Sequence, residues 1–190
     1  MIYMFLAPGF EEVEALAPLD LLRRAGLSVT TVAITLPETE HAVQGAHGIT
    51  VLADMSSDAF RRYVLSGETA DTVEAVILPG GMPGTTHLDE SPIVDAALAL
   101  ADKQGAYLCA ICAAPLVLGK RGYLTGKRAT CYPGFEAYLT GAEVGGKVIR
   151  DGRIVTAAGM GVAQEFGLEL VSALVSPEKA GDIRAAIQSL

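Results

Sequence analysis

Two kinds of apolar segment alternate along the chain. Short, almost continuous apolar runs, typical of buried β-strands, span residues 2–7, 27–35, 73–78, 106–111 and 154–157. Apolar residues recur instead at helical spacing over residues 11–25, 92–104, 113–120, 162–175 and 177–187. Buried strands separated by helices are typical of a parallel sheet with helices on both faces, so the pattern predicts an α/β fold.

Turn and capping residues refine these boundaries. Ser91-Pro92 is an N-cap followed by proline at the first helical position, and a glycine follows each of the first three predicted helices. Asp151-Gly152, between two short β-type runs, predicts a two-residue hairpin and hence one antiparallel ribbon. Pro18 is expected to kink the first helix or loosen its first turn. Because the chain has no repeat, low-complexity tract or linker, we predict a single domain over residues 1–190.

Composition and charge narrow the class of protein. Hydrophobic residues make up 51% of the 190 residues and charged residues 19%, which excludes a disordered chain. With 14 basic and 22 acidic side chains the formal charge is -8, so we expect no specific nucleic-acid binding, which needs clustered Lys and Arg. No apolar stretch approaches the roughly 20 residues of a membrane span, and the apolar start lacks the basic region of a secretory signal. We expect a cytoplasmic protein with no membrane partner and reduced cysteines.

Four loops are candidates for a functional site. Open α/β sheets bind ligands beyond the carboxyl ends of their strands. That edge is formed by the segments after the predicted strands, which are residues 8–12, 79–84, 112–114 and 158–161. We expect functional side chains to come from these loops.

Cys112 lies at a sharp turn from a predicted strand to a predicted helix. Small residues flank it at Ala110 and Ala114, as a nucleophile elbow requires. The N–H groups at the start of the helix favour the thiolate, and with those of the Gly80-Gly81 loop they are suited to hold an oxyanion. The local sequence equally allows Cys112 to be a small buried apolar residue. Both interpretations stay open at this point.

The pair Cys109 and Cys112 forms a C-x-x-C motif. Three residues along a strand span roughly 10 Å, whereas a disulfide needs Cα atoms within about 7 Å. A structural zinc site would need a second pair of ligands, and Cys131 and the three histidines are scattered in the sequence. We therefore predict no disulfide and no metal, with Cys109 in the core and the role of Cys131 undecided.

Three glutamates follow the first predicted strand. Glu11 and Glu12 are typical of a helix's first turn, where acidic side chains complement the dipole. Glu14 lies among apolar residues and is expected to face inward over the strand ends. A carboxyl in apolar surroundings has a raised pKa and can move protons near neutral pH, so a thiol beside it would form a nucleophile and acid-base pair.

In order and spacing, these motifs resemble the ThiJ/PfpI superfamily, and within it the DJ-1/YajL branch. The motifs are APGFEEVEALAPLDLLRRAG, VILPGGMPG, AICAAPLVL, RATCYP and AAGMGVAQEFGLELV, which together cover nearly the whole chain. The resemblance implies a three-layer α/β sandwich, with a mostly parallel, flavodoxin-like sheet, helices on both faces and a small antiparallel hairpin. It also implies a homodimer that needs no cofactor.

The resemblance assigns roles to individual residues. Cys112 would be the reactive cysteine, Glu14 the carboxyl that contacts its sulfur, and Gly81 and Ala113 the donors of oxyanion N–H groups. The protease-like branch carries His where this sequence has Ala113, so peptidase activity is not expected.

Two positions, Tyr132 and His47, depart from the family pattern. Tyr132 stands where some members have a His, and it is expected to orient the bound adduct. His47 replaces an Arg that shapes the pocket across the dimer interface in relatives. His47 and Gly80 are expected to contribute to substrate binding.

Three functions fit these observations. The first is a cysteine-dependent glyoxalase or deglycase acting on 2-oxoaldehydes such as methylglyoxal, or on early glycation adducts. The second is a redox-sensing stress-response or chaperone protein in which Cys112 is oxidised to sulfinate. The third is an inactive protein with a glutamine-amidotransferase-like fold, whose cysteine would be no more reactive than a free one.

Overall fold

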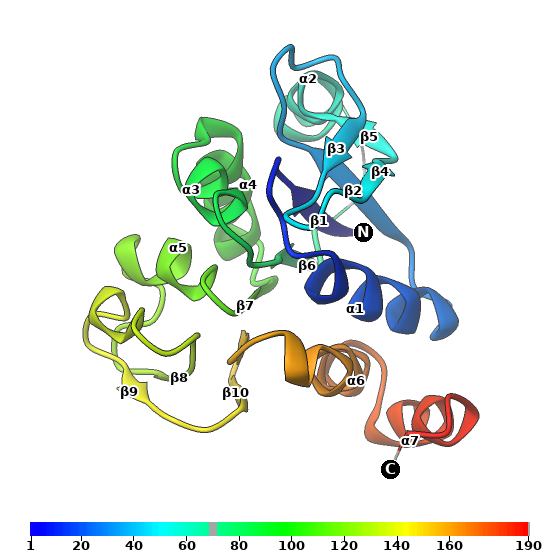
Figure 1. The fold of residues 1–190 in the computed structure, drawn as a ribbon, viewed down its shortest axis with the longest axis vertical. Coiled ribbons are helices and arrows are strands. Elements are labelled where there is room, and N and C mark those ends of the chain that lie inside the picture. Colours follow the sequence, from blue (N-terminus) through cyan, green and yellow to red (C-terminus); the bar gives the residue numbers. More distant parts are fainter. Residues whose placement is uncertain (69–71, 190) are drawn as a thin grey trace.

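The computed structural model describes residues 1–68 and 72–189 and is built on a seven-stranded sheet (Figure 1). Its strands are β1 (Ile2–Leu6), β2 (Val29–Ala33), β5 (Met55–Ser56), β6 (Ala75–Leu78), β7 (Tyr107–Ile111), β10 (Val148–Asp151) and β11 (Ile154–Ala157). Their order is β10-β11-β7-β6-β1-β2-β5. All neighbours pair in parallel except β10 and β11, which form the predicted antiparallel hairpin around Asp151-Gly152.

Helices cover both faces of the sheet. One face carries α1 (Glu12–Arg24), α6 (Ala163–Leu174) and α7 (Pro177–Ala186). The other carries α2 (Ser57–Phe60), the π-helical turn η1 (Arg61–Leu65), α3 (Gly84–Asp89), α4 (Pro92–Lys103) and α5 (Pro115–Lys120). Strand β1 shows why two cores form, because Tyr3 and Phe5 point into the α4 side while Met4 and Leu6 point into the α1 side. The predicted three-layer α/β sandwich is confirmed.

Helix α1 continues through Pro18, which lies against Gly167 of α6: a β-carbon at Gly167 would lie 2.8 Å from the Pro18 Cα. The kink expected at Pro18 stays a prediction. The structure also contains two small sheets that the apolar pattern did not predict. These pair β3 (Ala42–Gln44) with β4 (Thr50–Leu52), and β8 (Arg128–Ala129) with β9 (Glu143–Val144), and two 3-10 turns occur at η2 (Glu136–Tyr138) and η3 (Met160–Val162).

The strand order reverses next to β1. The connection from β1 to β2 passes through α1 on one face, whereas the connection from β6 to β7 passes through α4 on the other face. Loops leaving β1 and β6 therefore diverge, which opens a crevice at the carboxyl edge of the sheet. Among the helices of the described segments, none is both long and apolar enough to cross a bilayer.

Candidate active site

Cys112 occupies a strained turn between β7 and α5. Its φ is 63°, a left-handed value that side chains with a β-carbon rarely adopt. Two main-chain hydrogen bonds hold the turn: the Cys112 N–H donates to Ala157 O at 2.8 Å, and the Tyr132 N–H donates to Cys112 O at 2.7 Å. Because neighbouring segments fix the turn on both sides, the thiol stands at the carboxyl edge of the sheet.

The Cys112 sulfur has three polar neighbours. The N–H groups of Gly81 and Ala113 donate hydrogen bonds to it, and its thiol is hydrogen bonded to the Glu14 side chain. Burial and the adjacent Glu14 carboxylate raise the pKa of the Cys112 thiol to about 12, although the two N–H groups oppose this rise. The N–H groups therefore favour the thiolate as predicted, but burial and Glu14 have the larger effect and keep Cys112 protonated in the resting site.

Glu14 lies buried below the thiol. Its Oε2 accepts the Gly80 N–H at 3.1 Å, and the N–H of Met160 also donates to this carboxyl. Burial, with a smaller contribution from the charge of Glu11, raises the pKa of Glu14 to about 7. The contribution of Met160 was missed by the sequence reasoning, and the only signal for it was its place in a loop after a buried strand.

Cys112 and Glu14 form a coupled pair. Ionising the carboxyl makes the thiol harder to ionise, so the two side chains do not titrate independently. With its pKa near neutrality, Glu14 is suited to accept the thiol proton as the sulfur attacks and to return that proton later. The arrangement can therefore perform nucleophilic chemistry on an electrophilic carbon.

Glycines at the end of β6 allow this close packing. A β-carbon at Gly80 would lie 2.5 Å from Glu14 Oε2 and 2.6 Å from Cys112 Cβ. At Gly81, with φ of 91°, it would lie 2.3 Å from the Glu11 nitrogen. Since the N–H of Gly80 is occupied by Glu14, the expected contact of Gly80 with substrate stays a prediction.

His47 is tied to Glu12 rather than to the thiol. Its Nδ1 lies 2.8 Å from Glu12 Oε2, and its main-chain N–H donates to Glu12 Oε1 at 2.8 Å. Although burial of Glu12 opposes it, these hydrogen bonds lower the pKa of that carboxyl, and the same contact raises the pKa of His47. Glu12 was predicted only as a first-turn acid, whereas it anchors the β3–β4 turn to α1.

Among the described residues, one cluster has ligand atoms close enough together to hold a metal ion. It consists of Glu11, Glu12 and His47, whose ligand atoms all lie within 4.8 Å of one another. Glu11 accepts the Glu14 N–H at 2.6 Å as the N-cap of α1, and Glu12 accepts the hydrogen bonds of His47. Glu11 Oε2 and both Glu12 oxygens therefore have hydrogen-bond partners, which give Glu11 the role of a cap and Glu12 the role of an anchor.

Tyr132 and Glu14 flank the same point of the backbone. A β-carbon at Gly159 would lie 3.3 Å from Tyr132 Cδ2 and 3.9 Å from Glu14 Oε1. The Tyr132 side chain is half exposed, which places it at the rim of the site. The other two cysteines are buried, Cys109 in the core on the α1 side of the sheet and Cys131 in the core on the opposite side.

The strain at Cys112 leads to a stability prediction. Glycine adopts a positive φ without the penalty that a β-carbon carries, so Cys112→Gly is expected to be more stable than Cys112→Ala by about 1 kcal/mol. The free energies of unfolding in urea measure the difference. At Cys109, in the ordinary strand β7, the order should reverse, and an alanine advantage at both positions would contradict the prediction.

Comparisons with known proteins identify the family. The sequence profile described as the DJ-1/PfpI family matches residues 1–173. The chain belongs to the DJ-1/PfpI family. It is 36% identical over 183 residues to "Protein dj-1beta" of Drosophila melanogaster, covering 95% of this chain and 92% of that protein. It is 32% identical over 178 residues to "Glutathione-independent glyoxalase DJR-1.2" of Caenorhabditis elegans, covering 91% and 87%.

Solved structures show the DJ-1 fold as well. The structure "Toxoplasma gondii DJ-1, oxidized" superimposes with a TM-score of 0.88 at 32% identity, covering 98% of this chain and 97% of the other. The resemblance to the DJ-1-like branch of the ThiJ/PfpI superfamily is thereby confirmed. The relatives thus include a protein named as a glutathione-independent glyoxalase.

Proposed function

We propose that this protein is a cysteine-dependent glyoxalase and deglycase that acts without a cofactor on 2-oxoaldehydes such as methylglyoxal, or on early glycation adducts. One observation carries the proposal: the Cys112 thiol contacts both a carboxyl with a pKa near 7 and two main-chain N–H groups. These groups supply a nucleophile, a proton carrier and oxyanion donors. The glyoxalase name of the Caenorhabditis elegans relative supports the same reaction class.

In the proposed reaction, Glu14 accepts the thiol proton as the Cys112 sulfur bonds to the aldehyde carbon of methylglyoxal. The N–H groups of Gly81 and Ala113 hold the resulting alkoxide, which then takes the proton from Glu14 to become a hemithioacetal. Glu14 next removes the hydrogen on that carbon as a proton and returns it to the neighbouring carbonyl carbon, while the hydroxyl proton of the hemithioacetal passes to the oxygen of that second carbon.

The remaining steps release the product. The proton transfer oxidises the first carbon to a thioester and reduces the second to an alcohol, so no external oxidant or reductant is required. Water then hydrolyses the thioester to lactate and frees the thiol. Tyr132, at the rim, orients the adduct in this proposal, and a homodimer in the cytoplasm is part of the same hypothesis.

The test is an assay of the purified protein with methylglyoxal in the absence of glutathione. We expect lactate, identified by NMR, to form catalytically, because the site holds the nucleophile and the proton carrier together. A hemithioacetal of methylglyoxal with N-acetylcysteine, assayed beside it, measures the deglycase reaction. If neither substrate yields lactate while Cys112 is still a free thiol by mass spectrometry, the proposal is wrong.

Oxidation of Cys112 is the second candidate function. The Toxoplasma gondii DJ-1 structure is described as oxidised. In this chain the Glu14 side chain is hydrogen bonded to the Cys112 sulfur, on which a sulfinate would form. Conversion of the thiol to a sulfinate consumes two molecules of hydrogen peroxide and releases two of water. Intact-mass measurement after mild peroxide treatment tests this role, which requires the addition of two oxygens at Cys112.

A further inference from the structure

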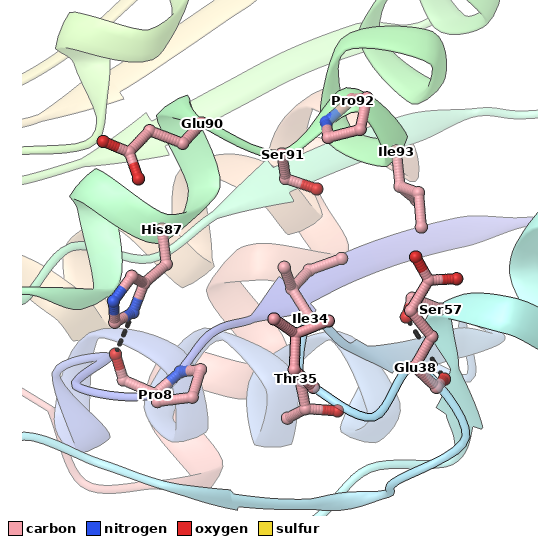
Figure 2. Close-up of a pocket in the computed structure, with 11 residues that line it drawn as sticks. Pro8, Ile34, Thr35, Glu38, Ser57, His87, Glu90, Ser91, Pro92 and Ile93 are labelled. Atoms are coloured by element: carbon pink, nitrogen blue, oxygen red, sulfur yellow. Dashed lines mark hydrogen bonds between the residues drawn. The ribbon is translucent and has the colours of Figure 1, made fainter.

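A cavity lies at the carboxyl edge of the sheet, apart from Cys112. Its volume is about 430 Å³, within the range of small-molecule sites. It lies between the segments that follow β1 and β2 and the start of α4 (Figure 2). Ile34 and Ile93 of its lining belong to the core on the α4 side, whereas Cys112 packs against the core on the α1 side. The cavity is therefore separate from the site already described.

His87 of α3 lines this cavity and keeps one ring nitrogen free as an acceptor. Its Nδ1 is hydrogen bonded to Pro8 O at 2.9 Å (Figure 2). A carbonyl oxygen only accepts, so Nδ1 carries the hydrogen and Nε2 of the neutral ring keeps a free lone pair. The hydrogen bond also fixes the ring against the wall formed by Pro8. A ligand at this end of the cavity therefore meets an oriented acceptor.

Glu90 adds a negative charge at the same end. It caps α3 three residues after His87, and Figure 2 shows the two side chains on the same side of the cavity. In the part of the chain that the structure describes, the Glu90 carboxylate has neither a hydrogen bond nor an ion pair. At the opposite end, Glu38 forms an ion pair with Arg61, which compensates its charge. The uncompensated charge of the cavity is thus that of Glu90.

The remaining lining selects between ligand classes. Neither lysine nor arginine lines the cavity, so an anion would meet Glu90 with no cation to offset the repulsion. Apolar surface comes from Ile34, Pro92 and Ile93, and Figure 2 shows Pro92 and Ile93 on the Glu38 side of the cavity, away from His87. A ligand that satisfies both regions has a positively charged hydrogen-bond donor at one end and an apolar body at the other.

We propose that this cavity binds a small amphipathic amine. Its ammonium group donates to the Glu90 carboxylate and the His87 Nε2, and its apolar body packs on Ile34 and Ile93. This second site does not depend on the reaction proposed at Cys112.

Phenethylamine, phenethyl alcohol and 3-phenylpropionate are matched probes for this site, because they share a benzyl body and differ in the charge of the end group. In NMR titrations of the full chain, we expect phenethylamine to bind with a Kd on the order of 1 mM or tighter and to shift the amide signals of Ile34 and Ile93. The alcohol is expected to bind about fivefold more weakly, and the carboxylate more weakly still. Equal affinity for the three probes, or shifts confined to residues outside the cavity, would overturn the proposal.

Three variants separate this site from other acidic surfaces and from the Cys112 site. Glu90→Gln, at an exposed position, should weaken phenethylamine binding about fivefold, to the level of the alcohol. Glu143→Gln, at another exposed glutamate, should leave it unchanged. Cys112→Ser should also leave it unchanged, and loss of binding there would instead assign the amine to the Cys112 site. Unchanged affinity in Glu90→Gln would contradict the role of this carboxylate.

Discussion

Replacing Cys112 with alanine is expected to lower kcat/KM for methylglyoxal at least about 1,000-fold. In the proposed reaction the sulfur forms the bond to the aldehyde carbon, and the substitution removes that atom while leaving Glu14 and the N–H groups of Gly81 and Ala113 in place. The residual rate of the variant then comes only from substrate binding and oxyanion stabilisation, because no covalent intermediate can form. Initial rates of lactate formation, with circular dichroism to verify the fold, measure the effect.

Serine at this position is expected to be nearly as inactive. A hydroxyl is far harder to deprotonate than a thiol, and a carboxyl with a pKa near 7 is too weak a base to activate it. Comparison of Cys112→Ser with Cys112→Ala thus tests whether nucleophilicity, rather than the shape of the side chain, controls the rate.

Cys131→Ala is the matched control. Cys131 is one residue from Tyr132 in the chain, but its side chain is buried in the core on the side of the sheet opposite α1, and burial, with the charge of Glu136, raises its pKa to about 11. We expect its removal to change kcat/KM by no more than about threefold. A loss of activity as large as that of Cys112→Ala would reject the assignment of a single nucleophile, as would a Cys112→Ala variant with a tenth or more of the wild-type rate.

The position of the site could be predicted from the sequence because buried strands have a strong local signal. Four of the main strands are apolar over nearly their full length, so their ends, and the loops after them, can be located without coordinates. Glu14 shows that these loops do lie together, since it contacts Gly80, Cys112 and Met160, one residue from each of three loops.

The ionisation of the site could not be predicted in the same way. The sequence shows that the N–H group of Ala113 lies next to Cys112 in the chain, and this N–H group does favour the thiolate. The larger effects are burial and the charge of Glu14, which is 98 positions away in the chain, and both depend on how tightly the cores close over the pair. Only the packed structure contains that information.

The β3–β4 hairpin escaped prediction for a different reason. Its strands have three residues each, and in β3 only Val43 is buried, so no periodic pattern can develop. Long-range main-chain hydrogen bonds hold it instead, from the Gly9 N–H to Gln44 O and from the Ala46 N–H to Phe10 O, both at 2.8 Å. The same hairpin carries His47 to Glu12, so the contact between those residues was equally invisible in the sequence.

Glu14→Gln is expected to stabilise the fold at alkaline pH while it reduces turnover at least about 100-fold. Glutamine cannot accept the thiol proton, which explains the loss of activity. The stability effect follows from the raised pKa. Between pH 4.5 and about 7 the folded state holds a proton that the unfolded state releases, so the stability of the wild type falls as pH rises through this window.

The size of this effect follows from the same two pKa values. A carboxyl whose pKa rises from 4.5 to about 7 costs the folded state up to about 3 kcal/mol above pH 7. The free energy of unfolding of Glu14→Gln minus that of the wild type should therefore increase by about this amount from pH 4 to pH 8.5. Urea unfolding of both proteins at intervals across that range measures it. The amide also changes the hydrogen bonds from Gly80 and Met160, but this effect does not depend on pH. It therefore cancels when the difference in free energy of unfolding between variant and wild type is compared at two pH values.

Glu12→Gln provides the opposite case on the same helix. Hydrogen bonds from His47 lower the pKa of Glu12, so its carboxylate stabilises the folded state above its unfolded pKa, and this contribution disappears as the pH falls. Between pH 4 and 6, below the ordinary His47 pKa of 6.5, Glu12→Gln should therefore become more destabilising as pH rises, whereas Glu14→Gln becomes more stabilising. Parallel pH curves for the two variants would mean that Glu14 ionises normally. Opposite slopes, together with lost turnover only in Glu14→Gln, would show that the fold maintains a destabilising carboxyl because the chemistry at Cys112 requires it.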